Sequence, residues 1–215
     1  MKKTDWNLYY SKPFKTALIT RKFTTRVLLN LIGEYMPQKK GFSISEIGGA
    51  NSCFFIDIYN KFRPERYIVI DNNQLGLDKF RERIGDMKNV KIVNDDILNP
   101  ATTNEKTDLT FSIGLIEHFD ITGTKNAILN HFNYLNNPGI LILSFPTPTL
   151  LYRITRKCAE ILSLWRFHDE RPLKVSEVED VVKNHGTILA KKIIWPIFLT
   201  QCIMVISYPG KKDSI

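Results

Sequence analysis

Short apolar runs alternate along much of the chain with segments whose apolar residues recur at helical spacing. The runs lie at residues 44–47, 67–70, 90–93, 109–113 and 140–145. Helical spacing occurs at residues 14–36, at 52–62, around Leu77, Phe80 and Ile84, and at 122–135. Because the runs are continuous, we expect strands that are covered on both faces. This alternation predicts right-handed crossovers and a doubly wound, mostly parallel α/β sheet with helices on both faces.

The C-terminal part of the chain follows a different pattern. Residues 175–185 predict a helix that ends at Gly186, and residues 188–195 and 201–208 then predict two strands in succession. With no helix between them, these strands are expected to form an antiparallel pair at the sheet edge. Residues 136–139, Asn-Asn-Pro-Gly, predict a turn. The run that follows is the most apolar of the five and is expected to be the central strand.

Length and composition indicate the broad class of protein. The length of 215 residues suits one domain, and 43% hydrophobic with 24% charged residues is ordinary for a folded globular protein. No apolar run reaches the roughly 18 residues needed to span a bilayer, and no apolar stretch follows the N-terminal lysines. We therefore expect a cytoplasmic protein. Cys53, Cys158 and Cys202 lie far apart without metal-ligand spacing, so we expect reduced thiols and no metal site.

The net charge of +8 is unevenly distributed along the chain. Residues 1–40 carry nine Lys or Arg and two acidic residues. Residues 41–149 carry ten basic and thirteen acidic residues, and residues 150–174 carry six basic and three acidic residues. The two basic segments therefore flank a mildly acidic middle. A basic surface suits an anionic partner such as a nucleic acid, a phosphorylated substrate or an anionic membrane. A solvated face that aids solubility is the equally weighted alternative.

Small and acidic residues stand where the first four predicted strands end. Ligands of doubly wound sheets bind beyond the carboxyl ends of the strands. A loop of small residues lets the backbone approach a ligand, and a carboxylate after the second strand can accept the hydroxyls of a ribose. Carboxylates after the third strand can accept an exocyclic amine. In order of strands, the candidates are Glu46, Gly48, Gly49 and Ala50; Asp71 and Asn72; Asp95, Asp96 and Ile97; and Ser112, Gly114, Glu117 and His118.

These segments resemble the successive motifs of the class I S-adenosylmethionine-dependent methyltransferases. The matching pieces are residues 46–52, 70–71, 94–97 and 111–119, and Gly-Leu-Ile-Glu-His-Phe at 114–119 is the most specific. The resemblance covers residues 42–146 and implies a seven-stranded sheet whose last strand is antiparallel. Ala50 and Ser52 stand where the family usually has glycines. Both are small, so we expect the site to survive, and the departure counts against a dinucleotide-binding dehydrogenase.

The resemblance also implies a role for each of these residues toward S-adenosyl-L-methionine. The loop from Glu46 to Ala50 would hold the amino-acid end of the cofactor, and Asp71 would take the ribose hydroxyls. Asp96 would take the adenine amine beside the Ile97 backbone. Ser112 and Gly114 would line the methionine portion, and Glu117 and His118 would lie near the path of methyl transfer. His118 is either a general base for a hydroxyl acceptor or a residue that packs and positions its loop.

Acceptor specificity is expected outside the cofactor core, in two segments. One is the N-terminal region with Trp6, Tyr9 and Tyr10. The other, residues 147–174, contains a predicted basic amphipathic helix near 150–165, followed by a polar and aromatic stretch. The helix has an apolar stripe of Leu151, Ile154, Cys158, Ile161 and Trp165, with Arg153, Arg156, Lys157 and Glu160 opposite. It is either a lid packed on its own domain or a contact for an anionic membrane or a lipid-linked substrate. The candidate acceptor contacts here are Arg153, Trp165 and His168.

The sequence thus predicts one methyltransferase domain over residues 1–215. It comprises a basic helical cap (1–40), a cofactor-binding core (42–146), an acceptor or lid insertion (147–174) and a closing helix with strands (175–215). A small-molecule or glycan acceptor, methylated at a hydroxyl or amine, is the favoured substrate class. An RNA or DNA methyltransferase and a non-catalytic protein of the same fold are the alternatives.

Overall fold

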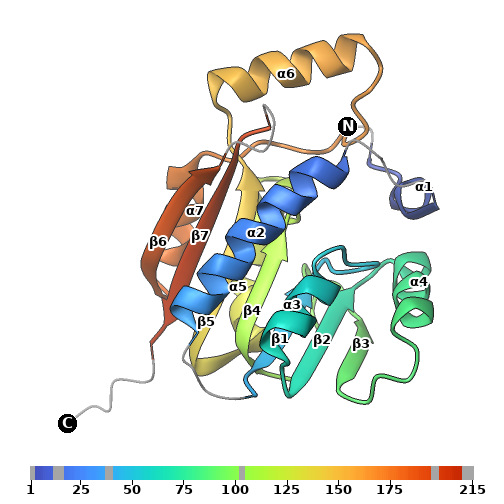
Figure 1. The fold of residues 1–215 in the computed structure, drawn as a ribbon. Helices are drawn as coiled ribbons and strands as arrows, with labels where there is room; N and C mark the ends of the chain where they lie inside the picture. The colour runs from blue at the N-terminus through green and yellow to red at the C-terminus, as the bar shows by residue number, and fades with distance from the viewer. Residues whose placement is uncertain (1–2, 12–16, 37–40, 102–104, 195–198, 210–215) are drawn as a thin grey trace.

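Seven strands form one mixed sheet in the computed structural model, which describes residues 3–11, 17–36, 41–101, 105–194 and 199–209. The strands are β1 (Ser43–Ile47), β2 (Arg66–Asp71), β3 (Val90–Asn94), β4 (Thr107–Ile113), β5 (Leu135–Pro146), β6 (Thr187–Ile194) and β7 (Gln201–Tyr208). Their order is β3-β2-β1-β4-β5-β7-β6, as Figure 1 shows. Strands β1 to β5 pair in parallel, and β7 runs antiparallel to both β5 and β6. The predicted doubly wound, seven-stranded sheet with an antiparallel last strand is confirmed.

Helices cover both faces of the sheet. They are α1 (Trp6–Ser11), α2 (Ala17–Tyr35), α3 (Phe55–Phe62), α4 (Gln74–Ile84), α5 (Ile121–His131), α6 (Leu150–Ile161) and α7 (Val175–Val182), with short 3-10 helices at Ile116–His118 and Phe132–Tyr134. Helices α2, α3 and α4 contribute to the core on one face, and α5 and α7 to the core on the other. Figure 1 shows α6 beyond the carboxyl ends of β4 and β5, apart from both layers.

The continuous apolar runs are explained by the two cores. Along β2, Tyr67 and Val69 enter the core beneath α2, α3 and α4, whereas Ile68 and Ile70 enter the core beneath α5. All four side chains are buried. Burying each such side chain stabilises the fold by about 1.5–3 kcal/mol. A strand with a core on both faces therefore needs apolar residues at consecutive positions.

Several details differ from the sequence prediction or lie outside the described residues. Residues 14–16 of the first expected helix and residue 195 of an expected strand lie outside the described residues. The helix expected to reach residue 135 ends at His131, because Leu135 already pairs with Thr107 of β4. The expected turn at 136–139 lies within β5, where Gly139 pairs with Tyr208. Strand β5 is interior but not central, since β4 is the middle strand of the seven.

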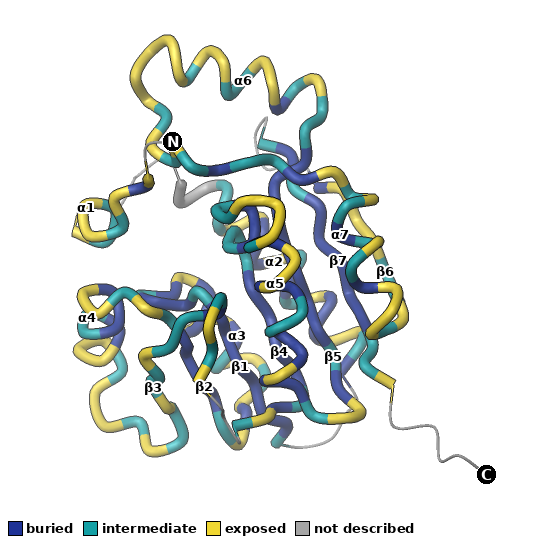
Figure 2. Tube along the Cα trace, turned by 180° about the vertical axis from the view of Figure 1, so that it is seen from behind, coloured by how far each residue is buried: buried dark blue, intermediate teal, exposed yellow. Residues whose placement is uncertain are grey.

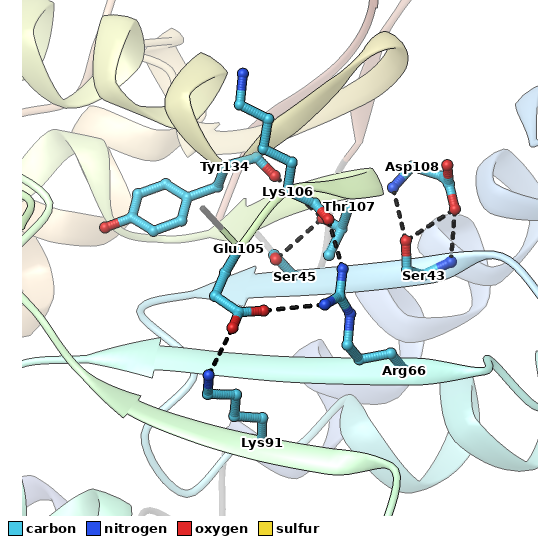
Figure 3. A network of polar contacts seen from close by, with 9 residues as sticks. All are labelled: Ser43, Ser45, Arg66, Lys91, Glu105, Lys106, Thr107, Asp108 and Tyr134. Atoms are coloured by element: carbon cyan, nitrogen blue, oxygen red, sulfur yellow. Dashed lines mark hydrogen bonds and ion pairs between the residues drawn. The ribbon is translucent and has the colours of Figure 1, made fainter. Parts of the chain in front are cut away.

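A polar network joins the amino-terminal ends of the strands, opposite the edge where a ligand is expected. Glu105 accepts from Arg66 of β2 at 3.0 Å and from Lys91 of β3 at 2.6 Å (Figure 3). The hydroxyl of Thr107 donates to Ser45 of β1 at 3.0 Å. These contacts fix the strands at one end of the sheet and leave the carboxyl ends to the loops that follow them. No described helix is both long enough and apolar enough to cross a lipid bilayer.

Candidate functional site

A cavity of about 920 Å³ opens at the carboxyl ends of β1, β2, β3 and β4. Its volume lies near the upper end of the range for ligand-binding cavities, roughly 300–1,000 Å³. Ten of the sequence-predicted cofactor and catalytic residues line it: Glu46, Gly48, Ala50, Asp71, Asn72, Asp95, Asp96, Ile97, Gly114 and His118. Residues from four separate strand ends are therefore brought together as the sheet topology predicts.

The loop after β1 is held by a buried carboxyl group. Glu46 accepts hydrogen bonds from the hydroxyls of Ser52 and Tyr67, each at 2.6 Å, and burial raises the pKa of Glu46 to about 7. A Cβ on Gly49 would lie 2.8 Å from Cγ of Glu46. Gly49 does not line the cavity and instead leaves room for Glu46. Gly48 has a φ of +74°, a conformation that favours glycine, and it lines the cavity.

The departure from glycine at Ser52 has a structural explanation. Its hydroxyl oxygen accepts from the backbone N–H groups of Phe54 and Phe55, each at 3.1 Å, while its proton goes to Glu46. Ser52 therefore binds free N–H groups at the start of α3 and links them to the loop. A glycine could not make these three hydrogen bonds.

The carboxylate of Asp71 organises the turn after β2. It accepts from the backbone N–H groups of Ala50 at 3.0 Å and Asn73 at 2.8 Å, and burial raises its pKa. Each carboxylate oxygen has two acceptor positions, so Asp71 keeps capacity for donors from a ligand in the cavity. Its neighbour Asn72 is exposed and lines the same cavity.

The two acids after β3 have different surroundings. Asp95 accepts from the backbone of Asp96 at 2.9 Å, from Ala101 at 3.1 Å and from the Tyr134 hydroxyl at 2.7 Å. Asp96 accepts from the backbone N–H of Leu98 through one oxygen, at 2.9 Å. Asp95 is thus engaged in holding the turn, and Asp96 is the acid better placed to accept from a ligand.

The predicted residue Ser112, near the carboxyl end of β4, lies away from the cavity. Ser112 is buried and its hydroxyl contacts Nε2 of His131 at 2.9 Å, so it faces α5 and not the cavity. Burial lowers the pKa of His131 to about 4, so this histidine is neutral and structural. The wall comes instead from Ile113, Leu115 and Gly114, the last with a φ of +71°.

His118 forms a pair with a residue that the sequence did not single out. Its Nδ1 lies 2.9 Å from Oδ1 of Asp169, and both side chains line the cavity. Burial lowers the pKa of His118, but the hydrogen bond to Asp169 and the nearby acidic groups outweigh it, so the net shift is upward. Because a carboxylate can only accept, Nδ1 donates, and in the neutral imidazole Nε2 is the acceptor.

Known structures share this arrangement of elements. No protein-family model and no curated protein sequence matches the chain. The N-methyltransferase NodS of Bradyrhizobium japonicum WM9, solved with S-adenosyl-L-homocysteine, superposes with a TM-score of 0.67 at 16% identity, over 90% of this chain and 89% of NodS. The magnesium protoporphyrin IX methyltransferase ChlM of Synechocystis PCC 6803, also with bound S-adenosylhomocysteine, gives 0.72 at 14% identity, over 94% and 92%.

The chain has the fold of the class I S-adenosylmethionine-dependent methyltransferases. An O-methyltransferase family protein of Burkholderia thailandensis is a further match, with a TM-score of 0.67 at 11% identity, over 92% of this chain and 59% of that protein. The cavity of this methyltransferase fold lies where its strands β1 to β4 end.

Two segments outside the strands of the methyltransferase fold meet over the cavity. The backbone N–H of Thr4 donates to Asp169 at 3.0 Å, and its hydroxyl contacts the same carboxylate. Trp6, Tyr9 and Tyr10 line the cavity, as expected, and the Trp6 ring packs edge-on against His118 with 4.9 Å between centroids. The N-terminal region and the segment after α6 therefore form one wall together.

Three predicted acceptor contacts lie elsewhere. Arg153 is exposed on α6, and His168 is exposed beside the wall without lining the cavity. Trp165 packs against the Arg156 guanidinium, 5.3 Å from its ring centroid, and against the ring of Phe167. The prediction rested on residue type within the segment and not on the direction of each side chain, and contact of these three residues with the acceptor stays a prediction.

Several lining residues escaped the sequence analysis. Among them are Lys3, Thr4, Arg21, Cys53, Asp169 and Arg171. Asp169 and Thr4 are 165 positions apart and carry no spacing pattern that would join them. The available signals were the basic character of the two flanking segments and the polar and aromatic stretch after the predicted helix. Both indicated segments and not individual residues.

Glu117 lies beneath the cavity and not on its surface. It is buried, burial raises its pKa to about 8, and its Oε2 has no hydrogen-bond partner among the described residues. This position argues against direct catalytic contact. Among the described residues, Glu117, His118 and Glu170 form the one group that could offer three ligand atoms to a metal ion. Without a cation, burial favours the protonated, neutral form of the Glu117 carboxyl.

Replacing Glu117 with glutamine should flatten the dependence of stability on pH. A carboxyl whose pKa rises from 4.5 to about 8 on folding binds its proton more tightly in the folded state. Stability is then lost as the pH rises through this window, by up to about 1.4 kcal/mol per pH unit. Urea denaturation of wild type and Glu117→Gln across the window should show this difference in slope. The exposed-carboxyl control Glu82→Gln should keep the wild-type slope, and equal slopes for all three proteins would refute a buried neutral Glu117.

Proposed function

We propose that this chain is an S-adenosylmethionine-dependent methyltransferase that methylates a hydroxyl or amine of a small-molecule or glycan acceptor. One observation carries the proposal: Gly48, Asp71 and Asp96, from three successive strand ends, line one cavity of the methyltransferase fold. We further propose that residues 1–40 and 147–174 of this single domain serve the acceptor, and that the enzyme works in the cytoplasm.

The residues present fit a nucleoside with an attached amino acid. A Cβ on Gly48 would lie 3.1 Å from the side chain of Leu115, so there is little room for a side chain at this position. The backbone of Gly48 therefore lines the cavity without a side chain. Asp71 would accept the ribose hydroxyls, and Asp96 the adenine amine beside Ile97. Gly114 would lie along the amino-acid portion. When bound, the cofactor supplies a methyl group on a positively charged sulfur, which is already activated for transfer.

His118 would act as the general base. With Nδ1 donating to Asp169, its Nε2 can take the proton that the acceptor hydroxyl or amine loses. The carboxylate of Asp169 orients the imidazole and stabilises its charged form. The pKa of Asp169 is lowered because hydrogen bonds from His118 and Thr4 outweigh the effect of burial, so Asp169 stays ionised for this role.

The acceptor would lie against the aromatic wall. Trp6, Tyr9 and Tyr10 offer flat apolar surfaces of the kind that pack on rings, and the cavity also contains Lys3 and Arg21. Holding the acceptor in line with the sulfur–methyl bond supplies much of the rate enhancement of such a transfer. Thr4 meets Asp169, and Trp6 and Tyr9 pack against Phe167, so both basic segments take part in the same site.

A label-transfer assay tests this function. The protein is incubated with S-adenosylmethionine carrying a labelled methyl group and a panel of hydroxy compounds, amines, saccharides and RNA. We expect label in a small or saccharide acceptor, with release of S-adenosylhomocysteine. Label confined to RNA would establish the nucleic-acid alternative, and absence of cofactor binding would establish a non-catalytic protein.

A further inference from the structure

Helix α6 and the turn after it present large apolar side chains to solvent. The exposed fractions are 76% for Leu150, 52% for Ile154, 71% for Ile161, 65% for Leu162 and 64% for Leu164. Figure 2 shows most of α6 as exposed. Single exposed apolar residues are ordinary on a monomer, whereas a cluster of five on one helix and its turn marks a surface that meets another apolar phase.

The orientation of this face is fixed from the opposite side of the helix. Tyr152 is buried, and its hydroxyl contacts the buried carboxylate of Glu170. Nearby, Arg156 donates to the backbone carbonyl of Glu170 at 2.8 Å. Tyr152 lies roughly 200° around the helix from Leu150, at 3.6 residues per turn. Helix α6 is thus anchored by its polar and aromatic side and holds its apolar side outward.

This orientation decides between the two interpretations of α6 that the sequence left open. A lid packed on its own domain would bury the apolar stripe. Instead, Ile154 and Ile161 are largely exposed and Cys158 is exposed as well. They lie on one face with Leu150, because residues four and eleven apart are nearly aligned at about 3.6 residues per turn.

The charge around the face identifies what can cover it. Residues 150–166 contain four basic residues and one acid, and that acid, Glu160, pairs with Arg156 at 2.9 Å. Arg153 and Lys157, one turn apart, are exposed beside the apolar stripe. A second copy of this chain would bring the same positive charge to the contact. An anionic phospholipid surface offers both the acyl region for the leucines and the opposite charge for these two cations.

We propose that α6 docks the protein on an anionic membrane surface and that the acceptor is carried by that membrane. The helix follows β5 directly, and the chain leaving it supplies Asp169 and Arg171 to the cavity. A surface covering α6 therefore lies next to the acceptor wall. Docking rests on the geometry of α6 alone, and the membrane-borne acceptor rests also on the proposed methyl transfer.

Flotation with lipid vesicles tests the docking. Wild type should float with vesicles of phosphatidylcholine and phosphatidylglycerol, and binding should weaken as salt rises, since charge attraction is screened over about 10 Å at 0.1 M. Arg153→Glu with Lys157→Glu should weaken binding at least about thirtyfold, because each basic residue at an anionic surface contributes about 1 kcal/mol. Ile154→Ser with Ile161→Ser should also lose binding. Arg156 is left unchanged because it anchors the helix.

A charge-matched control separates docking from general attraction. Lys88 and Lys106 are exposed just before β3 and β4, at the opposite end of the sheet. Lys88→Glu with Lys106→Glu should keep most of the binding. Failure of wild type to bind anionic vesicles at low salt, equal loss in the control pair, or a dimer through α6 in lipid-free sedimentation would each overturn the proposal. Binding of S-adenosylhomocysteine, measured without vesicles on the same variants, shows separately whether the cofactor site is intact.

Discussion

Replacing His118 with glutamine should lower methyl-transfer turnover by about two to four orders of magnitude, the range expected for loss of a general base. Glutamine keeps polarity and approximate size but cannot take up the acceptor proton. The affinity for S-adenosylhomocysteine should change little, because His118 is assigned to the acceptor and not to the cofactor. Turnover is measured by release of S-adenosylhomocysteine, and affinity by calorimetry.

The matched control for this change is His168→Gln. His168 belongs to the same wall segment as Asp169 but is exposed and does not line the cavity. Its replacement should leave turnover near the wild-type value. If His118→Gln were as active as wild type on a true acceptor, the His118–Asp169 pair would be a packing element and the base would have to be sought elsewhere.

The pH profile of turnover gives a second measure of the same role. A base works only when neutral, so activity should rise with pH through the pKa of His118, which lies above the ordinary value of 6.5. Asp169→Asn removes the main interaction that raises this pKa. The rising limb should therefore move to lower pH, while turnover falls because the imidazole is less well oriented. If the rising limb of the pH profile stays at the same pH in Asp169→Asn, the ionisation of His118 does not control turnover.

The sheet and the cofactor side of the cavity were predictable because they depend on local patterns. A strand buried on both faces needs consecutive apolar residues, and β2 shows this with Tyr67 to Ile70. Strand ends of a parallel sheet meet at one edge, so Asp71 and Asp96 could be placed together without knowing any side-chain direction.

The features of the site that the sequence did not predict depend on side-chain direction and on contacts between residues far apart in the sequence. Ser112 and Gly114 were expected to act together, yet Ser112 turns toward His131 of α5. The contact of Thr4 with Asp169 joins two ends of the chain that no periodicity relates. In α6 the predicted stripe holds in part: Ile154, Cys158 and Ile161 are exposed, whereas Trp165 lies beyond the end of the helix at Ile161 and packs against Arg156. The direction of the exposed face is set by the attachment of Tyr152 to Glu170.

Replacing Asp71 with alanine should weaken cofactor binding by about 1.5–3 kcal/mol, or roughly tenfold to 150-fold in Kd, the range for hydrogen bonds to a charged group. The change removes the acceptor proposed for the ribose hydroxyls, and it also frees the N–H groups of Ala50 and Asn73. Asp71→Asn keeps the size and one acceptor oxygen, so its loss should be smaller. The exposed control Asp86→Ala should bind as wild type does, and thermal unfolding checks that every variant is folded. If Asp71→Ala bound the cofactor with wild-type affinity, Asp71 would not be a cofactor-binding residue.

Calorimetric titration of the wild-type protein with S-adenosylhomocysteine tests the central claim most directly, because it needs no knowledge of the acceptor. The loop at Gly48, the carboxylates of Asp71 and Asp96 and the methyltransferase fold together predict saturable binding at one site per chain. A parallel titration with a nicotinamide dinucleotide should show none, because the loop is not built for a pyrophosphate. Binding of the dinucleotide in place of S-adenosylhomocysteine would contradict the account.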